Sequence, residues 1–206
     1  MNSFKQEIPP YNPPDKYSFA YWENFFSEEE LNKILSLKEW DNVENAKIKM
    51  CEEGNGRPTI DSNLRRTNIS WIDNNQDTKF IWDKLSLTIA EVNSRYFQFN
   101  LTGLYENIQL GCYKSESLDE YGWHVDTTLS AYGVMRKLSI ALLLSDIAEF
   151  EGGDLELKPS SDTPVKLEQK KGRAWFFPSY MLHRVTPVTK GIRKSLVVWV
   201  GGPPFK

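Results

Sequence analysis

The sequence predicts a mainly β fold of the α+β class, in which a double-stranded β-helix, or jelly roll, is buttressed by N-terminal helices. Two observations support this prediction. Helical periodicity is confined to the first half of the chain, and from about residue 104 it gives way to short β-branched and aromatic segments separated by Gly, Pro, Asp and Ser turns. Helices first and many short strands afterwards are typical of two packed sheets with helices beside them.

The length of the chain fits a single domain over residues 1–206, with two predicted parts. Residues 1–103 supply an arm, helices and a loop, and residues 104–202 supply the jelly-roll core. A hydrophobic fraction of 40%, with 7 Trp, 9 Tyr and 11 Phe, is sufficient for a large core.

The first half of the chain begins with a polar, Pro-rich stretch, residues 1–17, which predicts an extended arm. The motif SEEE that follows is a capping box, in which Ser27 caps a helix and Glu30 reaches back to it. The apolar face of this short helix comprises Leu31, Ile34 and Leu35.

A long irregular segment and a second helix complete this half. Residues 41–66 carry Gly, Asn, Pro and charge, and they predict a long loop or an irregular hairpin. The segment NISWI, residues 68–72, is a predicted strand. A longer helix is expected from an N-cap at Asp77 to about Phe97. Its residues at helical spacing are Phe80, Ile81, Leu85, Ile89, Val92 and Tyr96.

From residue 104 onward the expected strands follow one another closely, each bounded by turn residues. They are LYENIQLGCY (104–113), GWHVD (122–126), RKLSIALLLSD (136–146), GDLELK (153–158), VKLEQ (165–169), RAWFFP (173–178), MLHRVTPV (181–188) and KSLVVWVG (194–201).

Charge and composition argue against several classes of protein. The net charge of -3 disfavours a general nucleic-acid-binding surface. The longest apolar run, IALLL, is too short to span a bilayer, and the first residues contain no apolar segment of a secretory signal. Cys51 and Cys112 have no metal-ligand spacing, so we expect free thiols in a reducing cytoplasm.

The chain contains only two histidines, His124 and His183. His124 opens the tripeptide His-Val-Asp in a predicted strand, where residues i and i+2 face the same side. His124 and Asp126 would therefore project together, with Val125 turned into the opposite layer. If His183 comes from a facing strand, two imidazoles and one carboxylate meet, which is the facial triad of non-haem Fe(II) oxygenases. The alternative is that both histidines are ordinary polar residues near strand ends.

A basic residue, Arg193, follows His183 by ten positions at the start of a predicted strand. An inward guanidinium beside a metal site offers two parallel hydrogen bonds to a carboxylate. The alternative is a solvated arginine in a basic turn, residues 190–194. Next to the triad, we interpret Arg193 as an acid-binding residue.

The motifs HVD, GGDLEL and HRVTPVTKGIR, with Trp199 six residues beyond the last, carry a family resemblance. Together they resemble the Fe(II)/2-oxoglutarate-dependent dioxygenases, and among these the prolyl 4-hydroxylase-like branch that includes bacterial PKHD-type hydroxylases. The resemblance covers roughly residues 104–202, with a weaker similarity at LRRTNISW, residues 64–71.

The resemblance implies a reaction, its cofactors and a partner. The reaction is hydroxylation of a peptidyl proline, of the procollagen-proline type, with oxidative decarboxylation of 2-oxoglutarate to succinate and CO2. Fe(II), 2-oxoglutarate and O2 are expected, with ascorbate as the reductant. The expected partner is a proline-containing peptide or protein, over which the segment from about Cys51 to Asn68 would close. Neither a membrane nor nucleic acid is expected to bind.

The resemblance also implies roles for individual residues. His124, Asp126 and His183 match the iron ligands, which are also the catalytic residues. Arg193 matches the residue that pairs with the distal carboxylate of 2-oxoglutarate, and Tyr113 matches a tyrosine lining the same pocket. The positions that match the channel for the target proline are Tyr121, Arg136 and Trp199.

One position departs from the family pattern. Several relatives carry a tyrosine in the strand after the HVD motif, and this chain has Leu143 there. Arg193 then needs another polar partner, for which Tyr113, Thr128 and Ser195 remain open.

Two further functions remain open at this stage. The chain could be a 2-oxoglutarate oxygenase of a free amino acid, another small molecule or a nucleobase, although no basic stripe favours nucleic acid. It could instead be a jelly-roll module that holds a metal, or none, without turnover. Consumption of 2-oxoglutarate separates this last function from the other two.

Overall fold

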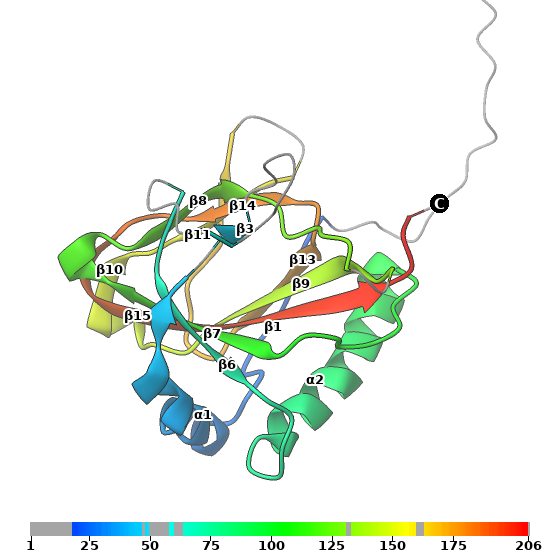
Figure 1. The fold of residues 1–206 in the computed structure, drawn as a ribbon, viewed down its shortest axis with the longest axis horizontal. Helices are drawn as coiled ribbons and strands as arrows, with labels where there is room; N and C mark the ends of the chain where they lie inside the picture. The colour runs from blue at the N-terminus through cyan, green and yellow to red at the C-terminus, as the bar shows by residue number, and fades with distance from the viewer. Residues whose placement is uncertain are drawn as a thin grey trace, which may run out of the picture.

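The computed structural model describes most of the chain as two stacked β-sheets with two helices outside one of them (Figure 1). The mainly β, jelly-roll prediction is confirmed. The predicted arm, Cys51 and most of the predicted substrate loop lie outside the described residues. The described ranges are 18–46, 48–49, 58–59, 64–130, 133–159 and 163–205.

The helices and strands have the following bounds. The helices are α1 (Glu28–Leu35) and α2 (Lys79–Val92), with a π-helical turn at Asn93–Phe97 and 3-10 turns at Lys38–Asn42, Ser115–Ser117 and Ile147–Glu149. The strands are β1 (Ala20–Trp22), β2 (Glu44–Asn45), β3 (Ile48–Lys49), β4 (Pro58–Thr59), β5 (Arg65–Arg66), β6 (Asn68–Ile72), β7 (Ile108–Lys114), β8 (Glu120–His124), β9 (Met135–Leu143), β10 (Phe150–Gly152), β11 (Leu155–Lys158), β12 (Val165–Lys166), β13 (Ala174–Pro178), β14 (Leu182–Val185) and β15 (Val188–Gly202).

Most strands of the second half alternate between the two sheets, as in a jelly roll: β7, β9, β13 and β15 lie in the larger sheet, and β8, β11 and β14 lie in the smaller one. The larger, eight-stranded sheet has the order β1-β13-β9-β15-β7-β6-β2, with β10 paired to β15. The smaller, five-stranded sheet has the order β12-β11-β14-β8-β5, and β3 pairs with β4 apart from both. Because β1, β2, β5 and β6 precede residue 104, both predicted parts of the chain contribute to the sheets. The assignment of a single domain stays a prediction.

The central strands of the larger sheet have one apolar face and one functional face. The residues of β15 that pack towards the helices are Leu196, Val198 and Val200. Because alternate side chains of a strand point to opposite faces, Arg193, Ser195 and Trp199 face the smaller sheet. The same alternation in β9 turns Ser139 and Leu143 into the interior between the sheets.

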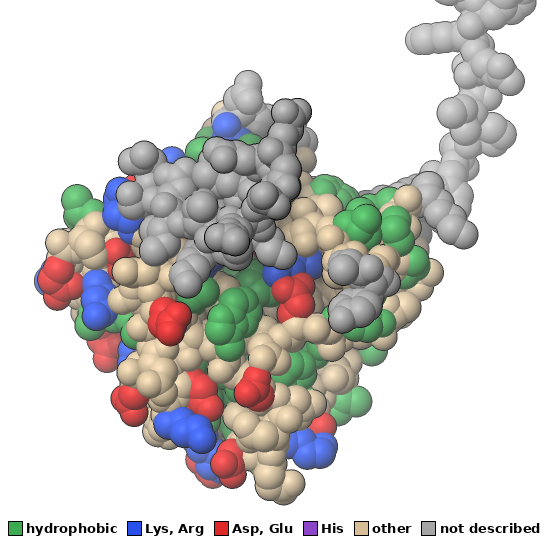
Figure 2. Space-filling model, viewed as in Figure 1, with side chains coloured by type: hydrophobic (Ala, Val, Ile, Leu, Met, Phe, Trp, Pro, Cys, Tyr) green, Lys and Arg blue, Asp and Glu red, His purple; other side chains and the backbone are tan. Residues whose placement is uncertain are grey.

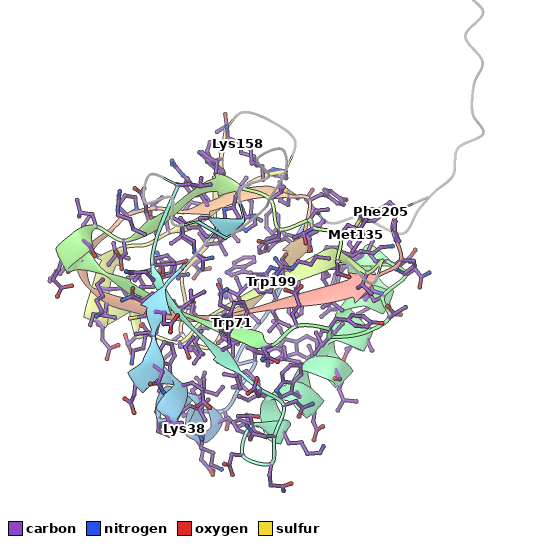
Figure 3. All side chains as sticks on the ribbon, in the orientation of Figure 1. Lys38, Trp71, Met135, Lys158, Trp199 and Phe205 are labelled. Carbon is purple, nitrogen blue, oxygen red and sulfur yellow. The ribbon has the colours of Figure 1, made fainter. Side chains whose placement is uncertain are left out.

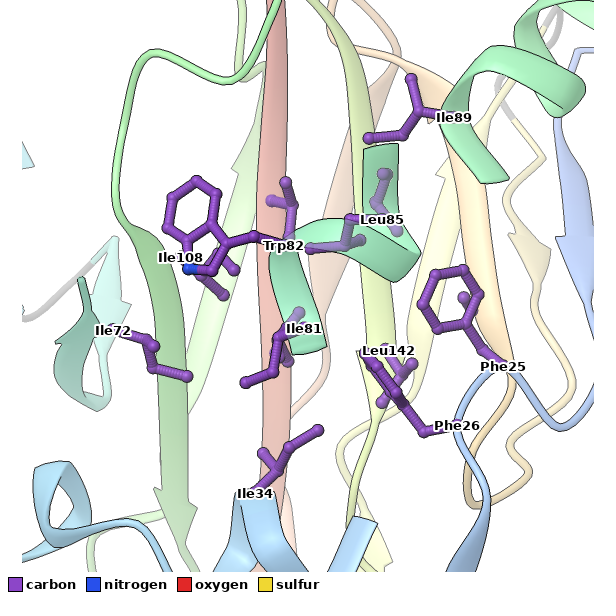
Figure 4. Close-up of a cluster of buried hydrophobic side chains, with 14 of the residues drawn as sticks. Phe25, Phe26, Ile34, Ile72, Ile81, Trp82, Leu85, Ile89, Ile108 and Leu142 are labelled. Carbon is purple, nitrogen blue, oxygen red and sulfur yellow. The ribbon is translucent and has the colours of Figure 1, made fainter. Parts of the chain in front are cut away.

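The outer face of the larger sheet is covered by α2. Figure 4 shows Ile81, Trp82 and Leu85 of this helix directed at the strands, near Ile108 and Leu142. Burying a side chain of this size stabilises the fold by about 1.5–3 kcal/mol relative to leaving it exposed. With 14 residues, α2 is the longest described helix, and none in the described ranges is long and apolar enough to cross a bilayer.

The capping box predicted for the first helix is confirmed. The Ser27 hydroxyl accepts from the N–H of Glu30 at 3.2 Å, and the Glu30 carboxylate accepts from the N–H of Ser27 at 2.7 Å. Leu31 and Ile34 are buried, as the predicted apolar face requires.

The predicted N-cap of the second helix at Asp77 is wrong. The N-cap is Thr78, whose hydroxyl donates to the carbonyl of Asp73. The Asn75 side chain accepts from the N–H groups of Asp77 and Thr78 at 2.9 and 3.2 Å, and this Asx turn takes the place of the expected cap. Helical structure continues to Phe97 as predicted, with a π-helical last turn.

The predicted strands are confirmed in position, with corrections at their ends. Residues 104–107 precede β7, and β15 begins six residues before the predicted start at residue 194. Strands β1 and β10 were not predicted, because each is three residues long and is defined by pairing with a distant strand, β13 or β15.

Candidate metal centre

The three predicted ligands meet where β8 and β14 pair. His183 lies opposite His124 in the antiparallel register, and Asp126 follows two residues after the end of β8. One ligand atom of each residue lies within 4.8 Å of the others. The side chains of His124, Asp126 and His183 are only 11%, 8% and 7% exposed. They form one buried cluster, which the alternative of two separate polar histidines does not explain.

Both imidazole rings are oriented by backbone carbonyls. The Nδ1 atom of His124 lies 2.8 Å from the carbonyl oxygen of Gly122, and that of His183 lies 2.8 Å from the carbonyl oxygen of Met181. A carbonyl only accepts, so each Nδ1 carries the proton and each Nε2 keeps a free lone pair. These Nε2 atoms lie 3.6 and 3.4 Å from the carboxylate oxygens of Asp126. The arrangement can hold a divalent metal through two Nε2 atoms and one carboxylate.

Asp126 is held by two serines from other parts of the fold. The carbonyl of Ser179 accepts the backbone N–H groups of Asp126 and Thr127 at 2.8 and 3.0 Å. The Ser139 hydroxyl, on β9, donates to Asp126 Oδ2 at 2.8 Å and lies 3.0 Å from the Ser179 hydroxyl. With Oδ2 engaged in this way, Oδ1 is the carboxylate oxygen left free for a metal. Val125 does not enter a packed layer, because β8 ends at His124, and its side chain is 48% exposed.

The cluster favours the protonation states of metal ligands. Burial raises the pKa of Asp126. The neighbouring His183, His124 and Trp199 lower this pKa by more than burial raises it, so it lies below its ordinary value. Burial lowers the pKa of His183 to about 4, although the carboxylate of Asp126 opposes this shift. At neutral pH the carboxylate is therefore ionised and the His183 imidazole is neutral, as metal binding requires.

Arg193 carries a buried guanidinium. The residue is 5% exposed, and its Nε and Nη1 atoms have no hydrogen-bond partner among the described residues. Its Cζ atom lies 5.3 Å from the centre of the Tyr113 ring, which belongs to the paired strand β7. Burial lowers the pKa of Arg193. The alternative of a solvated arginine in a basic turn is wrong, and the free donors fit a carboxylate that comes from outside the chain.

Of the three candidate polar partners of Arg193, two lie near it in the structure and one does not. Ser195 is 3% exposed and lies opposite Leu143 across the β9–β15 pair. A Cβ placed on Gly111 would lie 3.1 Å from the Ser195 hydroxyl and 3.2 Å from the Tyr113 ring, so both side chains border one small space. Thr128 is instead exposed in the open cleft described below. Tyr113 and Ser195 are therefore the polar groups on the same wall as Arg193.

Tyr121 packs directly on the cluster of the three predicted ligands. Its ring stacks on His124 with a centroid distance of 3.5 Å and an angle of 12°. In a regular strand these residues would face opposite sides, but the register shift between β8 and β14 brings both to one face. The guanidinium of Arg65 lies 4.3 Å from the Tyr121 ring centre, and burial raises the pKa of the Tyr121 hydroxyl.

Arg136 and Trp199 also meet, as the family resemblance implied. The Cζ atom of Arg136 lies 3.8 Å from a ring centre of Trp199, and its Nε donates to Glu106 at 2.6 Å. The ring centroid of Trp71 lies 6.3 Å from that of Trp199. Figure 3 shows the two tryptophans next to each other at the centre of the molecule. The side chains implied for the substrate channel thus border the same hollow as the metal cluster.

This hollow is a cleft of about 1440 Å³ between the two sheets. It is bordered by His124 and Asp126 on one side and by Trp199 and Arg136 on the other. Figure 2 shows hydrophobic side chains with a basic and an acidic group beside them near the centre of this face. Through this cleft a ligand can reach the cluster of predicted metal ligands.

Several residues of the site were not found in the sequence, among them Arg65, Gln109, Ser139 and Ser179. The two serines act from strands and turns far from Asp126 in the sequence, and nothing distinguishes them from other serines. Arg65 lies in the segment LRRTNISW, whose weak similarity to the family predicted no role for this residue. Gln109 was assigned to a strand, and only the period-2 pattern could have placed it on the inner face.

Comparison with known protein families agrees with this geometry. Residues 108–201 match the model of the 2OG-Fe(II) oxygenase superfamily. A PKHD-type hydroxylase of Synechococcus sp. (strain CC9902) is 38% identical over 87 residues, which are 42% of this chain and 38% of that protein. The chain thus spans less than two fifths of the length of this curated relative. The resemblance to 2OG-Fe(II) oxygenases of the PKHD type is confirmed.

Two solved structures that share this fold are prolyl hydroxylases. One, from Trichoplax adhaerens in complex with a hypoxia inducible factor oxygen degradation domain peptide fragment, has a TM-score of 0.70 at 20% identity and covers 89% of this chain and 83% of that chain. A Pseudomonas putida prolyl-4-hydroxylase has a TM-score of 0.66 at 17% identity and covers 89% and 92% of the two chains. At these identities the likeness concerns the fold.

The Ser139 hydroxyl is predicted to support metal binding through Asp126. We expect Ser139→Ala to weaken Fe(II) or Co(II) binding about tenfold or more, because Asp126 loses the donor that orients its carboxylate. The affinity is measured by anaerobic calorimetric titration of the purified protein.

A matched control for this variant is Ser145→Ala. Ser145 is also buried, but its hydroxyl bonds only to backbone groups of Ile192 and Lys194. This control should lose about 1 kcal/mol of stability and keep its metal affinity. An equal loss of metal affinity in both variants would contradict a specific role of Ser139.

Proposed function

We propose that this chain, whose residues 108–201 match the 2OG-Fe(II) oxygenase superfamily, is an Fe(II)- and 2-oxoglutarate-dependent dioxygenase that hydroxylates a prolyl residue of a peptide. One observation carries the proposal: a cluster of two histidines and one carboxylate shares the interior between the sheets with a buried guanidinium, whose Nε and Nη1 have no hydrogen-bond partner among the described residues. The cluster fits a non-haem Fe(II) ion, and the guanidinium fits a carboxylate cosubstrate.

The metal would be held by His124, Asp126 and His183. When bound, Fe(II) with 2-oxoglutarate and O2 supplies the oxidation: 2-oxoglutarate becomes succinate and CO2, and one oxygen atom enters a C–H bond of the substrate. The backbone carbonyls that contact each Nδ1 fix the two rings, so each Nε2 would be available to the ion. The C–H step needs no side-chain base, so the chain requires no third histidine.

The distal carboxylate of 2-oxoglutarate would pair with Arg193. Its buried N–H donors have no other partner among the described residues, and a charge-assisted hydrogen bond contributes about 1.5–3 kcal/mol. Tyr113 lies beneath the guanidinium, and Ser195 supplies a hydroxyl on the same wall. These two side chains would replace the tyrosine of relatives at the position of Leu143.

The size and lining of the cleft favour a peptide as the prime substrate. Small-molecule pockets usually measure about 300–1,000 Å³, and this cleft of about 1440 Å³ is larger. Tyr121 and Trp199 offer aromatic surfaces for a proline ring beside the cluster. A Pro-rich peptide presents a preformed polyproline II strand, which aromatic grooves bind at a low entropic cost. The structural neighbour from Trichoplax adhaerens, solved with a peptide, gives further support.

Several finer expectations stay predictions from the sequence. They are ascorbate as the reductant, a substrate of the procollagen type, and a cytoplasmic location.

Turnover of 2-oxoglutarate tests the proposal. With Fe(II) and ascorbate, the protein should consume 2-oxoglutarate faster when proline-rich peptides are present, and the peptide mass should rise by one oxygen atom. His183→Ala should abolish both effects, because it removes one of the two imidazole ligands. Consumption with an unchanged peptide mass would contradict the prolyl substrate. No consumption by protein with bound iron would contradict the oxygenase activity.

Arg193 is predicted to determine the affinity for 2-oxoglutarate. Arg193→Gln should raise the KM for 2-oxoglutarate about tenfold to hundredfold and leave metal affinity unchanged, because it removes only the ion pair. Lys194→Gln is the matched control, since Lys194 points to the other face of β15, over Trp40. An unchanged KM in the Arg193 variant, or the same rise in the control, would refute the assignment.

A further inference from the structure

The cleft is bordered by a buried guanidinium, Arg65, which the proposed reaction does not use. Arg65 of β5 is 8% exposed and borders the cleft. Its Nη2 donates to Gln109 Oε1 at 2.8 Å, and its Nε is buried without a hydrogen-bond partner. Within the described ranges, no carboxylate lies within ion-pair distance of Arg65. Its N–H donors are therefore only partly satisfied by the protein.

The neighbouring arginines have acidic partners. Arg136, in the same cleft, pairs with Glu106, and Arg66, the next residue along β5, pairs with Glu120. Burying an isolated cation inside a protein is more unfavourable than its contact with an aromatic face is favourable. The contact between Arg65 and Tyr121 therefore does not offset the burial of this charge. A negative group from outside the chain would offset it.

The position of Arg65 is close to the reaction centre. Tyr121 contacts both the Arg65 guanidinium, at 4.3 Å, and the ring of His124, at 3.5 Å. A single aromatic ring thus connects the guanidinium to a proposed iron ligand. An anion bound at Arg65 would lie beside the part of the substrate that reacts.

We infer that Arg65 and Gln109 form a carboxylate-binding subsite for the prime substrate, an inference that rests on the proposed hydroxylase function. Arg65 would donate to the carboxylate in a charge-assisted hydrogen bond. Gln109 accepts from Arg65 through its oxygen, so its amide N–H groups remain donors for the same anion. The carboxylate belongs either to an acidic residue next to the target proline or to the main-chain carboxyl group of a terminal or free amino acid.

Binding of matched acid and amide probes tests this subsite without turnover. The probes are a capped proline-rich peptide with Glu beside the proline, the same peptide with Gln, N-acetylproline and N-acetylprolinamide. Calorimetry on the anaerobic, Fe(II)-loaded protein with 2-oxoglutarate should show one acid binding at least about tenfold tighter than its amide. The pair that shows this difference identifies the source of the carboxylate.

Variants of Arg65 determine whether this residue causes the selectivity. Arg65→Gln should abolish the difference between acid and amide, and should change metal affinity and amide binding by no more than about twofold. Arg65→Lys keeps the charge and should restore part of the difference. Arg66→Gln is the matched control and should bind like the unmodified protein, because Arg66 does not border the cleft.

Two results would overturn the inference. One is equal affinity for acid and amide in both pairs. The other is an equal loss of both in Arg65→Gln together with weaker metal binding, since Arg65 would then only support Tyr121 against His124. Acid selectivity in a protein that hydroxylates no peptide would instead overturn the proposed function and leave the subsite in place.

Discussion

The antiparallel pairing of β8 with β14 is the constraint on which the site depends. This register sets His124 opposite His183 and, through its shift, brings Tyr121 to the same face. The carbonyls of nearby backbone then turn both rings, and the residue that accepts the N–H of Asp126 lies just before β14. The larger sheet contacts the site through β9, where the Ser139 hydroxyl donates to Asp126. Its apolar face is covered by α2, and its other face is free to present polar groups to the cluster.

The interior between the sheets holds two guanidinium groups, Arg193 and Arg65, that form no ion pair with the residues that the structure describes. In the described part of the chain, Nε and Nη1 of Arg193 have no hydrogen-bond partner on one wall, and Arg65 on another wall has one amide partner. The free energy of desolvating a cation is larger than the stabilisation from its aromatic contacts. Such residues therefore reduce the stability of the folded state unless a ligand pairs with them. One carboxylate from 2-oxoglutarate and one from the substrate would pair with both. The two buried guanidinium groups would then lower the stability of the ligand-free protein and make binding selective for two anions.

The spacing of His-x-Asp predicted that His124 and Asp126 lie close together, and they do. Strand alternation is not the cause, because β8 ends at His124 and the backbone bonds to Ser179 place Asp126. The capping box at Ser27 was predictable because both of its partners lie within three residues of each other. Contacts between distant strands were not predictable. Ser139 reaches Asp126 only after β9 packs across the interior, and Tyr121 joins His124 only through a register shift. The cap of α2 was missed because Asn75 forms an Asx turn ahead of Asp77.

If the proposed reaction is right, Fe(II) at the cluster and 2-oxoglutarate on Arg193 must share one interior. Visible absorption of the anaerobic, Fe(II)-loaded protein during addition of 2-oxoglutarate measures this directly, because chelation of ferrous iron by a keto and a carboxylate oxygen produces a charge-transfer band. We predict a band that saturates when one 2-oxoglutarate is bound per protein and that succinate does not produce. No band from protein with confirmed bound Fe(II) would contradict the shared site.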